Sequence, residues 1–264
     1  MKRPLYALIL SLLFWGTSNA QNVTLRQIGK NQVLFNILGG YPMNGILYTV
    51  DFNGTVNKTT LDSGIHTRLA NTSYSRGEKF FGLNNKLYLI EADGVLNEIN
   101  PYTGAWKAIT AMGVWTKIEK TVVVNNILYT TENGVFYRHR GVDIDNREAR
   151  GEAEFYNIGF FFDAGNSLYC LFGDGSFYEI SVADGKWRKI GKGKSWKSIK
   201  CGDVLGDKFY AVDVGGNFSE TLLSDGTKKT LDNTQFQKAK YIFVEGGKLY
   251  VIMTDGNLFE VVIN

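Results

Sequence analysis

Histidine is scarce in this 264-residue sequence, which contains only His66 and His139. Hydrolytic triads and many catalytic metal sites depend on a histidine. No histidine has an identifiable nucleophilic partner, and neither an HExxH nor a paired CxxC spacing occurs. We therefore predict a protein that is not an enzyme and that uses no cofactor or metal. Comparison among the repeats described below places His66 on an outer strand and His139 in an inward-facing or edge position.

Proline is also scarce, at three residues, and long apolar runs are missing beyond the first twenty residues. The one apolar stretch, Leu5 to Trp15, follows Lys2 and Arg3 and precedes small residues that end at Ala20. This pattern is typical of a cleaved secretory signal peptide, and the run is too short for a membrane anchor. We predict a signal peptide over residues 1–20, a single domain over 21–264, and a secreted protein, in the periplasm or at the cell surface if bacterial. We expect no transmembrane segment in the mature chain.

An excess of positive charge is missing too. The formal charge is +3, and it falls by two when Lys2 and Arg3 are removed. A dedicated nucleic-acid binder needs a broad basic face, so we expect no nucleic-acid partner.

What the sequence does contain is an internal repeat. The pair Leu-Tyr recurs at Leu47, Leu87, Leu128, Leu168 and Leu249, with Phe209-Tyr210 as a variant, at intervals of 40 or 41 residues. A glycine follows each pair, at Gly54, Gly94, Gly134, Gly175, Gly216 and Gly256, and five of these glycines follow Asn or Asp. Asn-Gly and Asp-Gly adopt positive φ at low cost, so we expect them to close two-residue hairpins.

Each repeat contains four short segments of strand character, and no stretch shows helical periodicity. Six such units predict an all-β fold, a six-bladed β-propeller of four-stranded blades; a solenoid is the alternative. The last unit lacks an outer strand, and residues 24–28 resemble one. Pairing this N-terminal strand with the last blade would close the ring and remove exposed sheet edges. In the third unit, charged residues between Asp143 and Glu154 replace the outer strand.

An aromatic residue stands thirteen positions before most of the Leu-Tyr sites, at Tyr74, Trp115, Phe155, Trp196 and Phe236. Repeats that combine an aromatic, a short apolar strand, Gly-x-Leu-Tyr and Asp-Gly resemble the tectonin and tachylectin-2 group of propeller lectins. Here residues 196–212 and 236–258 carry this short motif. The chain departs from tachylectin-2 in having six shorter units rather than five longer ones. The resemblance implies binding of glycans or surfaces.

These aromatic residues have two interpretations. They fill the space between blades, or they line repeated ligand sites together with Asp93, Asp174 and Asp255, because sugars present apolar ring faces beside hydroxyl groups. Several weak sites would gain strength through multivalency.

A basic cluster follows the fourth repeat, with no acid inside it: Lys186, Arg188, Lys189, Lys192, Lys194, Lys197 and Lys200. It is either a solvated blade edge that discourages aggregation or a patch for an anionic ligand. Trp187 and Trp196 lie among these residues and could stack on sugar rings.

Two cysteines, Cys170 and Cys201, permit one disulfide between neighbouring blades. Buried free thiols are the alternative.

Together these features predict a secreted, lectin-like binding module whose partners are cell-surface or extracellular glycans. The alternatives are a protein-interaction or structural propeller, and a hydrolase or lyase with carboxylates in the central channel. Fold alone does not decide among them.

Overall fold

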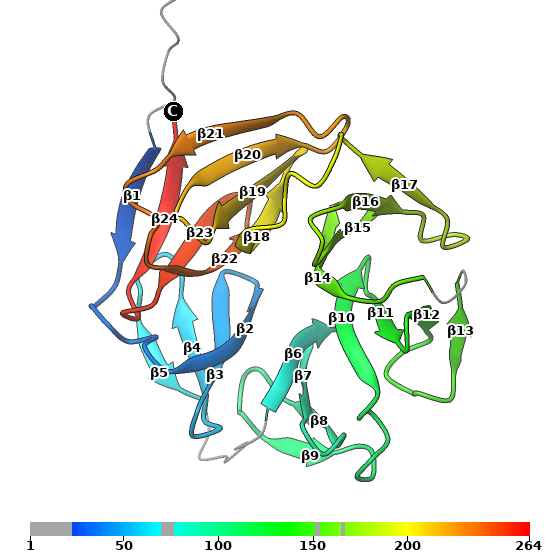
Figure 1. Cartoon of the computed structure of the whole chain (residues 1–264). Coiled ribbons are helices and arrows are strands. Elements are labelled where there is room, and N and C mark those ends of the chain that lie inside the picture. The colour runs from blue at the N-terminus through cyan, green and yellow to red at the C-terminus, as the bar shows by residue number, and fades with distance from the viewer. Residues whose placement is uncertain (1–22, 70–76, 151–153, 165–166) are drawn as a thin grey trace, which may run out of the picture.

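The computed structural model describes residues 23–69, 77–150, 154–164 and 167–264, so the predicted signal peptide and Tyr74 lie outside the described residues. Over these residues the chain forms twenty-four strands in six four-stranded antiparallel sheets. Figure 1 shows the sheets arranged around a central axis as the blades of a propeller. The predicted fold is confirmed.

Each blade is a meander that runs from the axis to the rim. Blade one contains β2 (Ile37–Met43), β3 (Ile46–Asp51), β4 (Val56–Thr60) and β5 (His66–Arg68). Blade two contains β6 (Gly77–Leu83), β7 (Lys86–Glu91), β8 (Leu96–Ile99) and β9 (Trp106–Ala108). Blade three contains β10 (Ile118–Val124), β11 (Ile127–Glu132), β12 (Val135–His139) and β13 (Arg147–Ala149). Blade four contains β14 (Ile158–Ala164), β15 (Ser167–Phe172), β16 (Phe177–Ile180) and β17 (Trp187–Ile190). Blade five contains β18 (Ile199–Leu205), β19 (Lys208–Asp213), β20 (Phe218–Leu222) and β21 (Lys228–Asp232).

The sixth blade joins the two ends of the described chain. Its inner strands are β22 (Ala239–Glu245), β23 (Lys248–Met253) and β24 (Leu258–Ile263), and its outer strand is β1 (Val23–Ile28). β1 pairs with β24 from Val23↔Ile263 to Ile28↔Leu258, as predicted. This pairing gives the last sheet its fourth strand and ties the first strand to the last one (Figure 1).

The second strand of each blade is buried on both faces, because neighbouring sheets stack against it from either side. In β7, Leu87 and Leu89 pack in the core between blades one and two, whereas Tyr88 and Ile90 pack in the core between blades two and three. The Leu-Tyr signature therefore marks two side chains that point to opposite neighbours.

Most of the turns after the second strands differ from the prediction. In blade two, Glu91 N–H bonds to the carbonyl of Val95, so three residues form the loop and Gly94 ends it with φ +80°. A three-residue loop with a left-handed glycine is the bulged hairpin type. The predicted two-residue turn occurs at Asn133-Gly134, where Glu132 pairs with Val135. At Gly175 the glycine is also required by space, because a Cβ would lie 2.4 Å from the backbone nitrogen of Lys197.

One further prediction from the sequence is wrong. The third blade keeps an outer strand, since β13 pairs with β12 through His139↔Arg147, and its charged residues form the solvated rim. Cys170 and Cys201 are free buried thiols that belong to different core clusters, which favours the second of the two alternatives, buried free thiols, over a disulfide. Each thiol packs as a small apolar side chain between its own pair of blades.

The propeller has two distinct faces. The connection face carries the chain from each outer strand to the next blade, together with the Asp-Gly turns. The hairpin face carries the turns between first and second strands and between third and fourth strands. On the connection face, backbone N–H groups of Leu34, Trp115 and Phe155 donate to the turn carbonyls of Gly256, Gly94 and Gly134 in the preceding blades. These bonds fix each blade against its neighbour.

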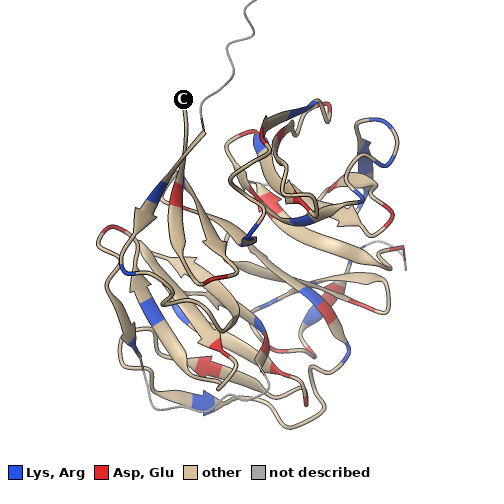
Figure 2. Cartoon of the chain, turned by 60° about the vertical axis from the view of Figure 1, so that its left-hand side comes forward, with Lys and Arg blue, Asp and Glu red and all other residues tan. Residues whose placement is uncertain are grey.

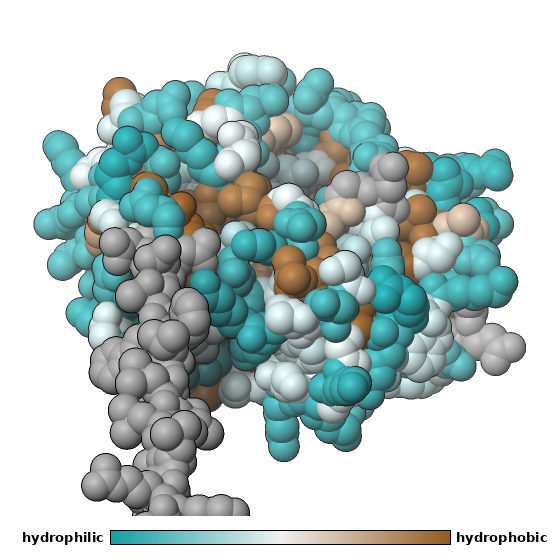
Figure 3. Space-filling model, turned by 90° about the horizontal axis from the view of Figure 1, so that it is seen from above, coloured by the Kyte–Doolittle hydropathy of each residue, from teal (hydrophilic) through white to brown (hydrophobic). Residues whose placement is uncertain are grey.

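The surface is polar and mixed in charge. Figure 2 shows basic and acidic residues interspersed over the blades. Seen from above, the rim is largely hydrophilic with small separate hydrophobic patches (Figure 3). No helix in the described part of the chain is long and apolar enough to cross a membrane.

Candidate functional site

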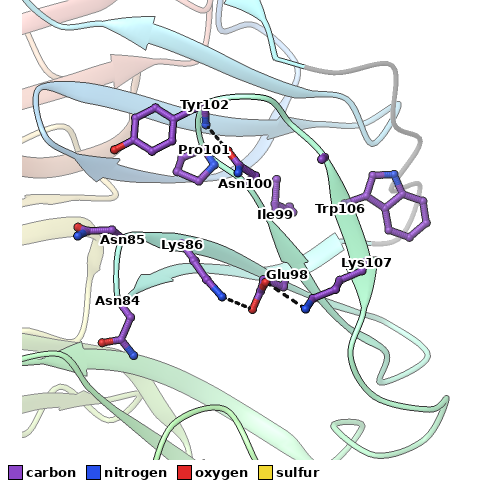
Figure 4. A pocket seen from close by; sticks show the side chains of 11 residues that line it. Asn84, Asn85, Lys86, Glu98, Ile99, Asn100, Pro101, Tyr102, Trp106 and Lys107 are labelled. Atoms are coloured by element: carbon purple, nitrogen blue, oxygen red, sulfur yellow. Dashed lines mark hydrogen bonds and ion pairs between the residues drawn. The ribbon is translucent and has the colours of Figure 1, made fainter.

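One candidate site is a pocket of about 470 Å³ on the hairpin face of blade two. It lies between the β6–β7 turn at Asn84 and Asn85, the end of β8, and the β8–β9 loop from Asn100 to Ala105. Figure 4 shows Tyr102 and Trp106 on either side of the pocket, with Lys86, Glu98 and Lys107 gathered below them. The pocket thus combines aromatic rings with charged groups.

The loop conformation places Tyr102 in solvent. The Asn100 side-chain oxygen accepts the N–H groups of Tyr102 and Thr103 at 2.9 and 3.0 Å, and Gly104 N–H closes the turn on the Asn100 carbonyl. An Asn side chain that bonds to the backbone two residues ahead stabilises such a turn. The side chain of Tyr102 is 74% exposed, and Trp106 on β9 is 50% exposed.

The charged part of the pocket is centred on Glu98. Its carboxylate pairs with Lys86 at 3.0 Å and Lys107 at 3.5 Å, and it accepts the Tyr88 hydroxyl at 3.2 Å. Burial opposes its ionisation, but the two lysines and the hydroxyl outweigh burial, so the pKa of Glu98 lies below its ordinary value. Burial and the Glu98 charge together raise the pKa of Tyr88 to about 12. At neutral pH the pocket contains one carboxylate flanked by two ammonium groups.

The tyrosine–glutamate pair is a repeated feature that the sequence reasoning missed. Across the second and third strands, Tyr88 pairs with Glu98, and the same arrangement recurs as Tyr169↔Glu179, Tyr210↔Glu220 and Tyr250↔Glu260. In each of these blades a lysine or arginine pairs with the glutamate: Lys86, Arg188, Lys208 and Arg26. The available signal was a glutamate ten residues after the tyrosine of the repeat. In blades one and three the residues that pair across from the tyrosine are Lys58 and Arg138 instead.

Blade four contains the equivalent pocket, of about 450 Å³, with Trp187 at the position of Trp106. Glu179 pairs with Arg188 at 2.5 Å and accepts the Ser167 hydroxyl at 2.9 Å. Ala183 stands where blade two has Tyr102, so this second pocket has a smaller aromatic surface. Two of the six blades therefore present an exposed tryptophan beside a glutamate and a base.

The aromatic residues predicted to bind ligand do not line these pockets. Trp115, Phe155, Trp196 and Phe236 are 0–3% exposed and lie between blades. For example, Trp196 packs edge-to-face on Phe177 at 5.2 Å, and its indole N–H donates to the Thr221 hydroxyl at 3.2 Å. A ring with this little exposed area has no face to offer a sugar, so the burial favours the packing interpretation. Tyr74 lies outside the described residues.

The three predicted aspartates stabilise the connection-face turns. The carboxylates of Asp93, Asp174 and Asp255 each accept the backbone N–H two residues ahead, at 3.1, 2.8 and 3.2 Å. Asp174 also pairs with Lys194 at 2.8 Å, and Asp255 with Lys238 at 3.4 Å. These aspartates are not brought together with the hairpin-face pockets.

The basic cluster is partly neutralised in space. Lys186, Arg188 and Lys194 pair with Asp184, Glu179 and Asp174. Lys200 donates to the carbonyl of Gln237 at 2.9 Å. Lys189, Lys192 and Lys197 are exposed, and no acid of the described chain lies within ion-pair distance of them. The surface available to an anion is therefore smaller than the sequence cluster indicates.

The two histidines occupy the predicted positions. His66 begins the outer strand β5, and His139 ends β12 with 1% of its surface exposed. His139 Nε2 lies 2.8 Å from the Thr130 hydroxyl, and its ring stacks on Trp115 at 5.4 Å. Both contacts are structural.

The central channel contains titratable groups of its own. A cavity of about 660 Å³ is lined by inner-strand residues that include Glu78, Lys79, Glu119 and Lys120. Burial and the nearby Asp163 raise the pKa of Asp203 to about 7, against two backbone N–H bonds that favour its charged form. No group of three metal-binding side chains occurs among the residues that the structure describes.

No protein-family model matches this chain, and no curated protein matches it in sequence. Solved structures do match in shape. Virginiamycin B lyase from Staphylococcus aureus, solved with quinupristin as an inactive variant, has a TM-score of 0.59 at 11% identity, covering 92% of this chain and 100% of its own. BamB from Moraxella catarrhalis has a TM-score of 0.50 at 16% identity, covering 84% and 68%.

A third similar structure is PorZ, a surface component of the type-IX secretion system of Porphyromonas gingivalis. Its TM-score is 0.54 at 12% identity, with 90% of this chain and 33% of PorZ covered. At such identities the likeness shows the propeller fold alone. Because these proteins include a lyase and a surface component, the fold is compatible with a binding or interaction module and does not select a ligand.

Proposed function

We propose that this protein is a secreted, non-enzymatic, lectin-like module that binds surface glycans through the hairpin-face pockets of blades two and four. The observation that carries the proposal is the pairing of exposed rings, Tyr102 and Trp106, with the charged cluster at Glu98 in one pocket. These pockets lie in the outer part of single blades, whereas the sequence pattern indicated ligand sites between the blades.

The chemistry of the pocket suits a sugar. A pyranose has an apolar face that stacks on an aromatic ring and hydroxyl groups that bond to charged and amide side chains. In the blade-two pocket, Glu98 is an acceptor, and Lys86 and Lys107 are donors. The volumes of both pockets are typical of small-ligand sites. Two weak sites on one molecule would bind a multivalent surface more tightly than either site alone.

The test is a glycan-array screen of the purified full chain at low and at physiological salt. We expect saturable binding to a narrow set of sugars that survives physiological salt and is lost in a Tyr102→Ala plus Trp106→Ala variant. Phe52→Ala is the matched control, because Phe52 is a similarly exposed aromatic residue on the opposite face. Binding only to sulfated or phosphorylated glycans, lost in salt, would instead favour the basic cluster. A blank array refutes the proposal.

A second candidate function, protein interaction, is favoured by the connection face. Five exposed large apolar side chains lie in its loops: Phe35, Phe52, Met112, Tyr156 and Val214. Exposed apolar groups on one face are characteristic of interaction surfaces. Cross-linking from a photoreactive group at position 52, compared with the same group at position 102, would show which face meets a partner. The third candidate, carboxylate chemistry in the channel, would require a substrate whose turnover is lost in Asp203→Asn.

A further inference from the structure

A separate pocket of about 320 Å³ lies at the outer edge of blade four, facing blade three. Its walls include three aromatic rings, Phe172, Tyr178 and Trp187, and two carboxylates, Glu154 and Asp174. We call these five residues the aromatic corner. Phe172 ends β15, Tyr178 lies in β16 and Trp187 begins β17. Glu154 lies in the connection between blades three and four, and Asp174 lies in the β15–β16 turn.

The rings meet nearly at right angles. Tyr178 contacts Trp187 with a centroid separation of 4.5 Å and an interplanar angle of 71°, and it contacts Phe172 at 5.3 Å and 81°. Perpendicular rings form adjoining walls rather than a flat stack. Trp187 keeps 44% of its surface exposed, so this side of the pocket is open to solvent.

The two carboxylates make the corner attractive to a cation. Glu154 accepts the indole N–H of Trp187 at 2.6 Å, which places its negative charge beside the ring. Asp174 pairs with the Lys194 ammonium at 2.8 Å, and this bond is the main reason why the pKa of Asp174 is lowered to about 2. The negative charge of Asp174 is therefore held at neutral pH.

The chain already places an ammonium group at the edge of the corner. The bond of Lys194 to Asp174 raises the pKa of the Lys194 ammonium. An ammonium group is thus compatible with this environment, and the Lys194 side chain is exposed to solvent. A neutral sugar could donate hydroxyl groups to these carboxylates but brings no positive charge to balance them, whereas in the blade-two pocket two lysines already pair with Glu98.

We propose that the aromatic corner binds an alkylated ammonium group, such as the trimethylammonium of choline or of trimethyl-lysine. Aromatic faces attract a cation through their quadrupole, and methylated ammonium ions suit such sites because they are weakly hydrated and have apolar surfaces. Glu154 and Asp174 supply the opposing charge. The proposal does not depend on glycan binding, although Trp187 lines both the aromatic corner and the blade-four pocket.

The test is calorimetric titration of the full chain at physiological salt with choline, phosphocholine and N-trimethyl-lysine. The control ligand is 3,3-dimethylbutan-1-ol, which has the shape of choline without its charge. We expect choline to bind at least roughly tenfold more tightly than this alcohol, because only the cation gains from the ring faces and carboxylates. Preference for phosphocholine would identify a lipid or glycan headgroup as the source, and preference for trimethyl-lysine a methylated protein.

Matched variants locate the site. Trp187→Ala should weaken choline binding on the order of tenfold, whereas Trp106→Ala, the equivalent change in blade two, should leave it unchanged. Trp187→Phe keeps a ring and should retain part of the affinity, which guards against misfolding as the explanation. Lys194→Met should bind choline more tightly, because it removes the competing ammonium.

The proposal is overturned if the neutral alcohol binds as well as choline, or if no ammonium ligand binds at concentrations up to about 50 mM, beyond which affinity would be negligible. It is also overturned if Trp187→Ala and Trp106→Ala have equal effects. If the glycan array is blank and choline still binds, only the proposed glycan-binding function is refuted.

Discussion

His139 should make the protein less stable in mild acid. Its imidazole is enclosed between Trp115 and the Thr130 hydroxyl, at the end of β12. Burial, reinforced by the charge of Arg147, lowers the pKa of His139 from 6.5 to about 4, although Asp143 and Glu132 act in the opposite direction. In the unfolded chain the same side chain should titrate near its ordinary value.

The sign and size of the effect follow from these two values. Above pH 6.5 the histidine is neutral in both states and has no effect. Between pH 6.5 and 4 the unfolded state takes up a proton that the folded state excludes, so stability falls as pH falls. Each pH unit in this window changes the free energy of unfolding by about 1.4 kcal/mol, which gives a loss of about 2 kcal/mol between pH 7 and 5.

Urea unfolding of the wild type and of His139→Gln, followed by tryptophan fluorescence from pH 7 to 5, measures this loss. Glutamine can keep a hydrogen bond to Thr130 but does not titrate, so the variant should lack about 2 kcal/mol of the acid destabilisation. Other groups cancel in this comparison. An NMR titration of the wild type checks the cause directly, because the sequence contains only two histidines. Equal pH dependence of the two proteins, or a His139 signal that titrates near 6.5, would refute the reasoning.

Three further predictions concern buried groups. Asp203→Asn should become more stable than the wild type as the pH rises from 5 to 7. In this range Asp203 is ionised in the unfolded wild type and protonated in the folded one, so the wild type loses about 2–3 kcal/mol of unfolding free energy that the variant keeps. Parallel pH dependences in urea unfolding of the two proteins would contradict this prediction. Trp196→Ala should cost about 3–5 kcal/mol by leaving a cavity between blades four and five, whereas the exposed Trp106→Ala should change the unfolding midpoint little. Neither Cys170 nor Cys201 should react with Ellman's reagent in the folded protein, because burial raises the pKa of both thiols. Both should react once the protein is denatured without reductant. If the denatured, unreduced chain contains no free thiol, the two cysteines form a disulfide.

The blades were predictable because each one repeats a local pattern. Leu87 and Tyr88 alternate across a strand that is buried on both faces, and a positive-φ glycine such as Gly94 marks the turn that follows. Closure through β1 was predictable because the last repeat is one strand short. The type of turn was less predictable. Asp93-Gly94 and Asn133-Gly134 are similar in sequence, yet Asp93-Gly94 lies in a three-residue loop and Asn133-Gly134 in a two-residue loop.

The candidate sites were harder to predict, because sequence does not state which aromatic residues are covered. Trp115 and Trp196 precede inner strands and are covered by the adjacent blade. Trp106 and Trp187 begin outer strands, which have a neighbouring strand on one edge only, and they remain exposed. The charge pattern was similarly hidden, since Glu179 and Arg188 are nine residues apart in the sequence and pair across two adjacent strands.

The sequence by itself determined the repeat, the number of blades and the strand that closes the ring, because these depend on periodicity and on local backbone preferences. Only the tertiary structure decided which rings face solvent, that the two cysteines stay apart, and that Phe172, Tyr178 and Trp187 meet beside Glu154 and Asp174. The physical reason is that exposure and proximity depend on how each sheet packs against the next and on how loops from adjacent blades meet. The contact between Trp187 and Glu154, for example, joins blade four to the connection that comes from blade three.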